Sequence, residues 1–370
     1  MNFEFSPEQQ QLRDQARRFL EDRCDSAAVR VILDGPEPYD RKLWKGLAEM
    51  GFLGVNIPET HGGLGLGYLE LCVLAEELGR AIAPVPFSSS VYLATEFLLA
   101  AGSEAQKAAW LPKLASGEAI GTFALAEGSG QVTPSRIRAK AAGSALTGVK
   151  LPVADGDVAD FVVVAAQGDA GLSLYLVDLS GAGVARTTVA TIDPTRSHAQ
   201  LDFAGARAEL LGAPGEGWSI IEAVYDKAAI LTAFEQVGGA DKALTLARDY
   251  ALERMAFGRQ IGSFQAIKHM LADMYVSATL ARSNAYYGAW ALSTDSAELG
   301  EAAATARVSA TQAYQHCARN DIQVHGGMGF TWAFDCHLHY RRSNLLALSL
   351  GSLSQWEDKL IERLRAKNAA

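Results

Sequence analysis

Proline is missing from the last part of the sequence, since all eleven prolines of the 370-residue chain lie at or before Pro214. Proline breaks helix interiors, so its absence leaves the remaining residues free to form long, uninterrupted helices. Apolar residues recur there at helical spacing, for example at Leu271, Met274 and Ala278. Long helices within one domain are typical of a bundle, and we expect a four-helix bundle over residues 217–370.

Long apolar runs, paired cysteines and a surplus of basic residues are also missing. No run approaches the roughly 20 apolar residues that cross a bilayer. Met1–Phe5 shows no basic segment before an apolar one, so we expect neither a membrane span nor a secretory signal. The four cysteines have no CxxC spacing, which is typical of a reduced, cytoplasmic protein. The net charge of −9 argues against nucleic acid as a partner.

The rest of the chain divides into two segments with different periodicities. Residues 1–119 carry helix signals, such as the hydroxyl cap and first-turn proline at Ser6-Pro7 and the amphipathic run Tyr68–Arg80. Residues 120–216 contain short β-rich runs that glycine and aspartate separate. The sequence therefore predicts a mainly α protein in which a small antiparallel sheet or β-barrel lies between two helical domains.

Two motifs near the C-terminus contain residues that are suited to binding a nucleotide. The first begins at Glu253 and reads ERMAFGRQI, then FQAIK and LADM; Arg254 and Gln265 flank a turn where they could hold a phosphate and an amide. The second reads QVHGGMGF, and its Gly326 and Gly327 would let the backbone approach a ligand closely. Each motif also has a purely structural interpretation. The first could be an amphipathic helix that a glycine turn interrupts, and the second could be a helix C-cap.

Together, these motifs resemble those of the acyl-CoA dehydrogenase family, whose patterns RxxFGxxI…Q…LADM and QxxGGxGF both occur here with matching separation. The segments PETHGGLG from Pro58 and LPKLASGE from Leu111 resemble parts of that family's first domain. The resemblance extends from about residue 4 to about residue 364. It implies an N-terminal helical domain (1–119), a β-barrel (120–216) and a C-terminal four-helix bundle (217–370).

The resemblance also implies FAD as the cofactor, bound between barrel and bundle of one subunit and completed by a neighbouring subunit. The chain would then form a homo- or hetero-oligomer, either a dimer or a tetramer. The positions that match family contacts to the adenine and pyrophosphate end across the dimer interface are Arg254, Phe257, Gln265, Gln323, Gly326 and Gly327. An arginine suits this place because its planar donors fit the pyrophosphate oxygens.

Four further residues match family positions in the site. Gly351 and Ser352 match part of the cofactor site, and Tyr225 and Asp226 match positions near the CoA entrance. The carboxylate of Asp226 could accept hydrogen bonds from CoA amides. Its alternative interpretation is an exposed carboxylate on a helix.

The sequence departs from the family pattern where the flavin ring and the reacting carbon would lie. The usual TEPxxGSD-like loop is replaced by LAEGSG from Leu125, and the usual W-x-T is replaced by PVA from Pro152. The family's catalytic glutamate, in the usual Glu-Gly-Thr, is replaced here by Leu350. The alternative family position for the base, early in the bundle, is occupied by Ala228. Neither side chain can remove the α-proton of a thioester while hydride passes to the flavin.

Glu235 is the other carboxylate that we consider as a base. It lies seven residues after Ala228, which is two turns along nearly the same helix face and about 10 Å away. Burial would raise its pKa toward the range of a general base. Its alternative role is a structural ion pair with an arginine on a facing helix, such as Arg282 or Arg307.

We expect no metal site. Two histidines and a thiol within the four residues 336–339 rarely form a closed tetrahedral site without ligands from elsewhere. No ExxH motif occurs in the bundle, which argues against a di-iron carboxylate protein.

Two functions remain open at this stage. The first is FAD-dependent α,β-dehydrogenation of an acyl-CoA thioester, an oxidoreductase reaction on a CH–CH group with electron-transfer flavoprotein, or else oxygen, as acceptor. The second is a non-catalytic partner subunit of a hetero-oligomeric acyl-CoA dehydrogenase, which lends residues to the partner's FAD site. Family relatives of the second kind act on bulky thioesters, including steroid side chains.

Overall fold

The structure, a computed structural model, describes residues 5–369. Its contacts divide the chain into two compact units that interleave in sequence. The first unit comprises the residues up to Arg30, Tyr68–Ala83 and the residues from Ala229 onward; the second comprises Val31–Gly67 and Pro84–Ala228. The division into three consecutive domains therefore remains a prediction.

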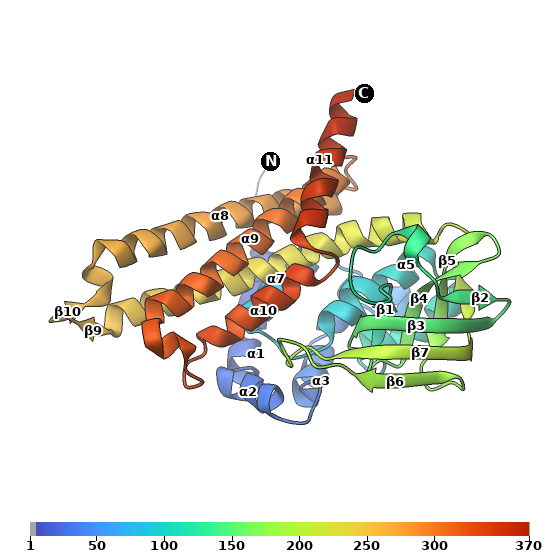
Figure 1. Cartoon of the computed structure of the whole chain (residues 1–370), viewed down its shortest axis with the longest axis horizontal. Helices are drawn as coiled ribbons and strands as arrows, with labels where there is room; N and C mark the ends of the chain where they lie inside the picture. Colours follow the sequence, from blue (N-terminus) through green and yellow to red (C-terminus); the bar gives the residue numbers. More distant parts are fainter. Residues whose placement is uncertain (1–4, 370) are drawn as a thin grey trace. The chain divides into compact units, whose positions relative to one another are not determined.

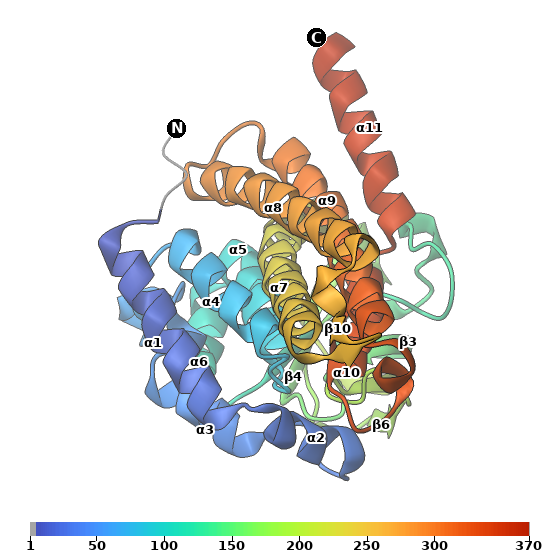
Figure 2. The same cartoon turned by 90° about the vertical axis from the view of Figure 1, so that its left-hand side faces the viewer.

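The first unit is helical, as the absence of late prolines predicts. Its helices are α1 (Pro7–Arg23), α4 (Tyr68–Arg80), the part of α7 (Gly217–Glu253) from Ala229, α8 (Gln265–Ser293), α9 (Leu299–His325), α10 (Cys336–Leu348) and α11 (Leu353–Ala369) (Figure 1). A short helix, α2 (Ser26–Asp34), crosses from this unit into the second. α8 and α9 pack side by side, and apolar residues of α7 form one cluster with residues of both helices (Figure 2). After Gly217, the described residues form one sheet, the two-residue strands β9 (Met255–Ala256) and β10 (Arg259–Gln260).

Glycine allows α4 and α7 to cross at backbone contact. A Cβ built at Gly79 would lie 1.9 Å from the carbonyl oxygen of Glu235, and one built at Gly238 would lie 1.9 Å from that of Glu76. Real Cβ atoms do not approach so closely, so any side chain at either position would push the two helices apart. This close crossing holds Glu235 in the interior of the unit.

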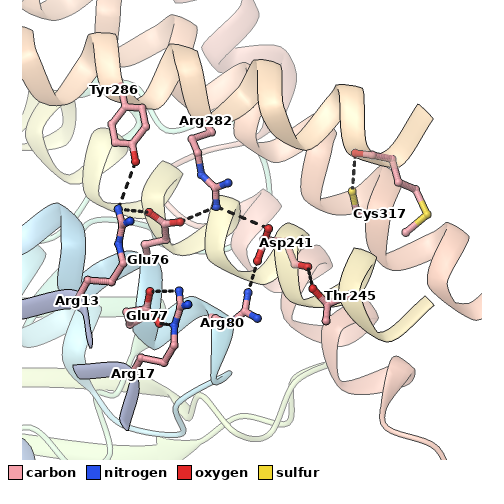
Figure 3. Close-up of polar contacts among 11 residues, drawn as sticks. Arg13, Arg17, Glu76, Glu77, Arg80, Asp241, Thr245, Arg282, Tyr286 and Cys317 are labelled. Atoms are coloured by element: carbon pink, nitrogen blue, oxygen red, sulfur yellow. Dashed lines mark hydrogen bonds and ion pairs between the residues drawn. The ribbon is translucent and has the colours of Figure 1, made fainter. Parts of the chain in front are cut away.

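Buried carboxylates of α4 and a half-buried carboxylate of α7 form an ionic network with arginines of α1, α4 and α8 (Figure 3). Arg17 donates two hydrogen bonds to Glu77, at 2.9 and 2.7 Å, and Arg282 donates to Glu76 at 2.6 Å. Arg80 pairs with Asp241. Because Glu76 and Glu77 are almost fully buried, these arginines provide the opposite charges that such carboxylates need.

The second unit is built on one sheet and several helices. Its helices are α3 (Arg41–Glu49), a π-helical turn (Ser88–Thr95), α5 (Glu96–Ala101), α6 (Glu104–Ala115) and the start of α7. Its strands are β1 (Gly121–Ala124), β2 (Lys140–Ala142), β3 (Ala145–Ala154), β4 (Phe161–Gly168), β5 (Gly171–Asp178), β6 (Val184–Thr188), β7 (His198–Arg207) and β8 (Glu209–Leu211). Strands therefore occupy the middle of the chain, between the helices that precede β1 and those that follow β8, as the change of period predicts.

The expected closed barrel is wrong, because the sheet is open. Its order is β6-β7-β3-β2-β4-β5-β8, with β1 paired to β4, and no ladder among the described residues joins β6 to β8. β8 is only three residues long, and β6 is exposed along most of its length, so the edges have little with which to pair. The sheet is also mixed rather than antiparallel, since β1 and β2 pair with β4 in parallel.

The sheet's inner face carries the core of the second unit. Alternate residues of β4 and β5, such as Phe161, Val163 and Leu174, pack against Phe97 and Leu111 from α5 and α6. No helix in the described part of the chain is both long enough and apolar enough to span a membrane.

Candidate functional site

The first motif forms the hairpin between α7 and α8 (Figure 1). Arg254 directly follows α7, β9 and β10 pair in antiparallel fashion, and Gln265 is the first residue of α8. Phe257 and Gly258 form the turn, with φ values of 52° and 79°, and the Phe257 residue is 94% exposed. Arg254 and Gln265 are exposed as well. These three side chains are therefore available to a ligand or a partner.

The second motif ends α9. Gln323 lies in the last turn of the helix and is exposed, and a 3₁₀ turn (Gly326–Phe330) follows. Gly326 has a φ of 60° and a ψ of −137°, a conformation that residues with a Cβ avoid. A Cβ at Gly326 or Gly327 would meet no described atom within 4 Å, so this glycine pair faces open space. A ligand can therefore approach its main chain closely.

A stacked pair of rings brings the two motifs together within the first unit. Tyr250, one turn before Arg254, stacks on His325, the residue before the glycine pair, with ring centroids 4.0 Å apart and 24° between the planes. Val324 belongs to an apolar cluster against which Ile261, just after the hairpin, also packs. The two motifs therefore share one end of the helical unit.

The groups that converge there fit the adenine and pyrophosphate end of FAD. Within residues 5–369, Arg254 forms no ion pair, so its guanidinium is free to bind an anion. Gln265 and Gln323 offer exposed amides that can donate and accept. The glycine pair adds main-chain groups that no side chain shields. An anionic ligand would find one guanidinium and several neutral donors in this place.

The loop at the usual base position is firmly held but carries no carboxylate. Leu350 has a φ of 61° and its carbonyl accepts a hydrogen bond from the Trp356 indole at 3.0 Å, while Ser352 N donates to Gln355 at 2.7 Å. The buried guanidinium of Arg307 donates to the Ser349 carbonyl at 2.6 Å and also to that of Leu346. The loop that contains Gly351 and Ser352 is thus ordered around an aliphatic side chain.

Glu235 lies inside the first unit as one half of an ion pair. It is 1% exposed, and its carboxylate is 3.5 Å from the guanidinium of Arg342, which is fully buried on α10. The two arginines expected as partners bind elsewhere: Arg282 pairs with Glu76, and Arg307 donates to the Gln236 side chain at 2.6 Å. The sequence thus anticipated a buried ion pair but not its partner, which lies more than a hundred residues away.

The expected substrate-side residues lie in the segment of α7 that belongs to the second unit. Tyr225 is half-buried, its ring meets Phe123 edge-on at 5.9 Å, and burial raises the pKa of its phenol. Asp226 is half-buried. Ala228 is fully buried, so the second family position for a base lies in the core and is inert.

The carboxylate in the LAEGSG segment is fully engaged. Glu127 accepts from the main-chain N–H groups of Arg138, at 2.7 Å, and Ala139, at 3.0 Å. Lys150, which is buried, donates to Glu127 at 2.7 Å and to the Leu125 carbonyl at 3.0 Å. Glu127 therefore ties this segment to β3 and the start of β2, and is not available as a base. The sequence did not reveal this role, because it depends on pairing across the sheet.

A further group that the sequence did not single out lies under the second motif. Asp321, His325 and Cys336 are buried, and one ligand atom from each lies within 4.8 Å of the others. The histidines near Cys336 lie elsewhere: His337 stacks on Trp332, and Nδ1 of His339 is 3.0 Å from the hydroxyl of Tyr314. The signal was present as an aspartate and a histidine four residues apart, but only the structure shows that both are buried.

The sequence of this chain matches the models of one known protein family over both of its helical ends. The model of the acyl-CoA dehydrogenase N-terminal domain matches residues 6–118, and that of the acyl-CoA dehydrogenase C-terminal domain matches residues 215–354. The acyl-CoA dehydrogenase IpdE2 of Mycobacterium tuberculosis is 34% identical over 338 residues, which is 91% of each chain. The chain belongs to the acyl-CoA dehydrogenase family. It is thus an FAD-dependent acyl-CoA dehydrogenase-like oxidoreductase.

Two solved structures have the same fold over nearly the whole length of this chain. A structure described as a variant of the Tcur3481-Tcur3483 steroid ACAD superposes with a TM-score of 0.89 and 30% identity, covering 98% of this chain and 99% of that one. The ChsE4-ChsE5 complex from Mycobacterium tuberculosis gives a TM-score of 0.91 and 29% identity, covering 99% of both chains. Both descriptions name two proteins.

Proposed function

We propose that the chain takes part in α,β-dehydrogenation of a CoA thioester, with its exposed bundle end holding the adenine and pyrophosphate end of FAD. The observation that carries the proposal is the convergence of Arg254, Gln265, Gln323 and the glycine pair at one end of the first unit, where Arg254 has no ion-pair partner among the described residues. A guanidinium beside neutral donors is the set that a diphosphate needs.

The same end of the unit is suited to a subunit contact. Phe257 is 94% exposed and Phe330 is 84% exposed, although both are large and apolar. Aromatic side chains are enriched in protein–protein interfaces, and exposed apolar groups gathered in one place are typical of such contacts. We propose that a neighbouring subunit covers them, so that Arg254 and Phe257 contact an FAD held mainly by that neighbour.

The chemistry divides between what these residues can do and what they cannot. FAD, when bound, supplies the hydride acceptor. Arg254, Gln265, Gln323 and the glycine pair would bind and orient its diphosphate end. Leu350 and Ala228 cannot accept the α-proton, and Glu235 is already paired with Arg342. Glu235 as a substitute base therefore remains a prediction, and its ion pair supports the structural role instead.

A second candidate function is the non-catalytic partner subunit of a hetero-oligomer. The specific observation in its favour is that the loop at 349–352 is ordered, held by Arg307 and Trp356, yet presents Leu350 where a carboxylate is needed. The similar ChsE4-ChsE5 structure is described as a complex, and the other similar structure is described as a steroid ACAD. We propose by analogy a bulky, steroid-like acyl-CoA as substrate, electron-transfer flavoprotein as acceptor and the cytoplasm as location.

Flavin retention tests the proposal directly. Arg254→Ala removes a charge-assisted hydrogen bond and should weaken FAD binding by about 1–3 kcal/mol in the purified assembly. Arg248→Ala is the matched control, because Arg248 is an exposed arginine of α7 that pairs with Asp249. FAD content and affinity should fall in the first variant only. Equal affinity in both variants would contradict the assignment of the bundle end.

A further inference from the structure

A buried acid and a buried histidine lie directly beneath the glycine pair. Asp321 and His325 are one helical turn apart at the end of α9, and they are 0% and 8% exposed. Nδ1 of His325 is 2.8 Å from the Asp321 carbonyl oxygen and 3.1 Å from its carboxylate. Within residues 5–369, no group other than this imidazole is a hydrogen-bond partner of the carboxylate oxygens, so the imidazole is the group that can balance their charge.

The surroundings of this pair contain few other titratable groups. Tyr250 of α7 covers one face of the imidazole, and the ring of Phe334 meets it at 5.5 Å. From α10, the Cys336 thiol donates to the Gly329 carbonyl at 3.4 Å, and burial raises its pKa to about 12. The thiol is therefore neutral near pH 7, and Asp321 and His325 are the groups of this cluster whose charge can change.

The buried carboxylate and imidazole are placed to share one proton, because their polar atoms lie 3.1 Å apart. Burial raises the pKa of Asp321, because the ionised carboxylate loses its hydration. Burial opposes protonation of His325, but the hydrogen bonds to Asp321 outweigh it and raise the pKa of the imidazole. With one proton the pair is neutral overall; without it, one negative charge lies at the C-terminal end of α9, which already has negative polarity.

We propose that Asp321 and His325 form a positioning pair for the Gly326–Gly327 turn, and that their shared proton keeps this turn receptive to a diphosphate. The inference rests on the proposed function, because the diphosphate is that of FAD. The two residues contact the turn from the protein interior and do not contact the ligand themselves. Loss of the proton would leave a buried negative charge under the turn that binds the anion, and the two like charges would repel.

A zinc ion is the alternative occupant that the three groups suggest. A carboxylate, an imidazole and a thiol suit zinc. However, Nδ1 of His325 already faces the Asp321 carbonyl, and the Cys336 sulfur already donates to a carbonyl. We therefore assign the cluster to proton binding, and zinc becomes an outcome of the test.

The first measurement is an NMR titration of the histidine rings in the purified assembly, without added FAD. His325 should titrate above its ordinary range in the wild type and shift downward in Asp321→Asn, which keeps the side-chain shape. Unfolding stability should fall as pH rises through the His325 pKa, because the native pair binds more protons than the unfolded chain. Titration of His325 at or below its ordinary value would overturn the inference, as would one tightly bound zinc per chain.

The second measurement is the affinity for FAD between about pH 7 and pH 9. The wild type should bind FAD on the order of tenfold more weakly at the higher pH, and Asp321→Asn should show no such loss. His339→Gln is the matched control, because burial lowers the pKa of His339 to about 3 and its charge does not change in this range. It should keep the wild-type slope even if it lowers stability. An equal slope in Asp321→Asn would overturn the inference.

The two measurements separate this inference from the proposed function. If the wild type binds no FAD at any pH, alone or with a related chain, the proposed function fails, and the flavin part of the inference fails with it. The histidine titration still decides whether the proton-sharing pair exists. If FAD binds with an affinity that does not depend on pH, the proposed function stands and the inference alone is refuted.

Discussion

Glu235→Gln removes one charge of a buried ion pair and leaves the other. The remaining charge has no access to water, since Arg342 is 0% solvent-accessible and its guanidinium lies 3.5 Å from the Glu235 carboxylate. Breaking a buried pair by removing one partner typically costs 3–5 kcal/mol, because the remaining charge is uncompensated. We therefore expect Glu235→Gln to lower the free energy of unfolding by about 3 kcal/mol or more.

The double variant Glu235→Gln/Arg342→Met distinguishes charge from shape. Methionine fills much of the space of the arginine stem without its charge, so the double variant should recover most of the stability that Glu235→Gln loses. Urea unfolding followed by circular dichroism, at a pH where the wild type is fully folded, measures both. If Glu235→Gln is as stable as the wild type but abolishes turnover, the ion-pair account is wrong and Glu235 is the base.

Packing at four other positions leads to further predictions. Gly79→Ala should cost about 1–3 kcal/mol of stability, because its Cβ would meet the Glu235 carbonyl oxygen. Gly327→Ala makes the same substitution at an open position, so it should change the free energy of unfolding by no more than about 0.5 kcal/mol. It should nevertheless weaken FAD binding, which flavin fluorescence measures. Phe257→Ala should also spare subunit stability, since the residue is 94% exposed, but should weaken the assembly in light scattering; an unchanged oligomer would contradict its interface role. Arg307→Met should lower the unfolding midpoint and speed amide hydrogen exchange in residues 349–352, because the carbonyls of Leu346 and Ser349 lose a charged donor. Unchanged exchange rates would show that the arginine does not hold the loop.

The helical C-terminal part could be predicted from the sequence because the distribution of a single residue type, proline, indicates where long helices can form. Proline is absent after Pro214, and α7 to α11 follow. The open sheet could not be predicted, because closure depends on whether β6 and β8 meet. Their lengths and neighbours are set by packing over the whole second unit, while the local pattern of short β-rich runs is the same in a barrel and in an open sheet.

The candidate site shows the same division between local and distant information. Arg254, Gln265 and the glycine pair follow from motifs that are contiguous in sequence. The partner of Glu235 does not, because α7 and α10 approach only after the intervening helices fold, and several arginines could have met it. The Asp321–His325 pair was hidden for a different reason. A spacing of four residues is common on exposed helix faces, and only burial turns it into a pair with one proton.

The central claim is that this chain has the cofactor-binding end of an acyl-CoA dehydrogenase but lacks the catalytic base. Reduction of bound flavin by acyl-CoA tests that claim most directly. The purified chain is mixed without oxygen with thioesters that range from short acyl chains to steroid-linked ones, alone and with a related chain that keeps the Glu-Gly-Thr loop. Positioned general-base catalysis typically contributes about 10²–10⁴-fold, so the flavin should bleach slowly or not at all with this chain alone and quickly when the related chain is present. Fast bleaching by this chain alone, unaffected by Glu235→Gln, would contradict the account.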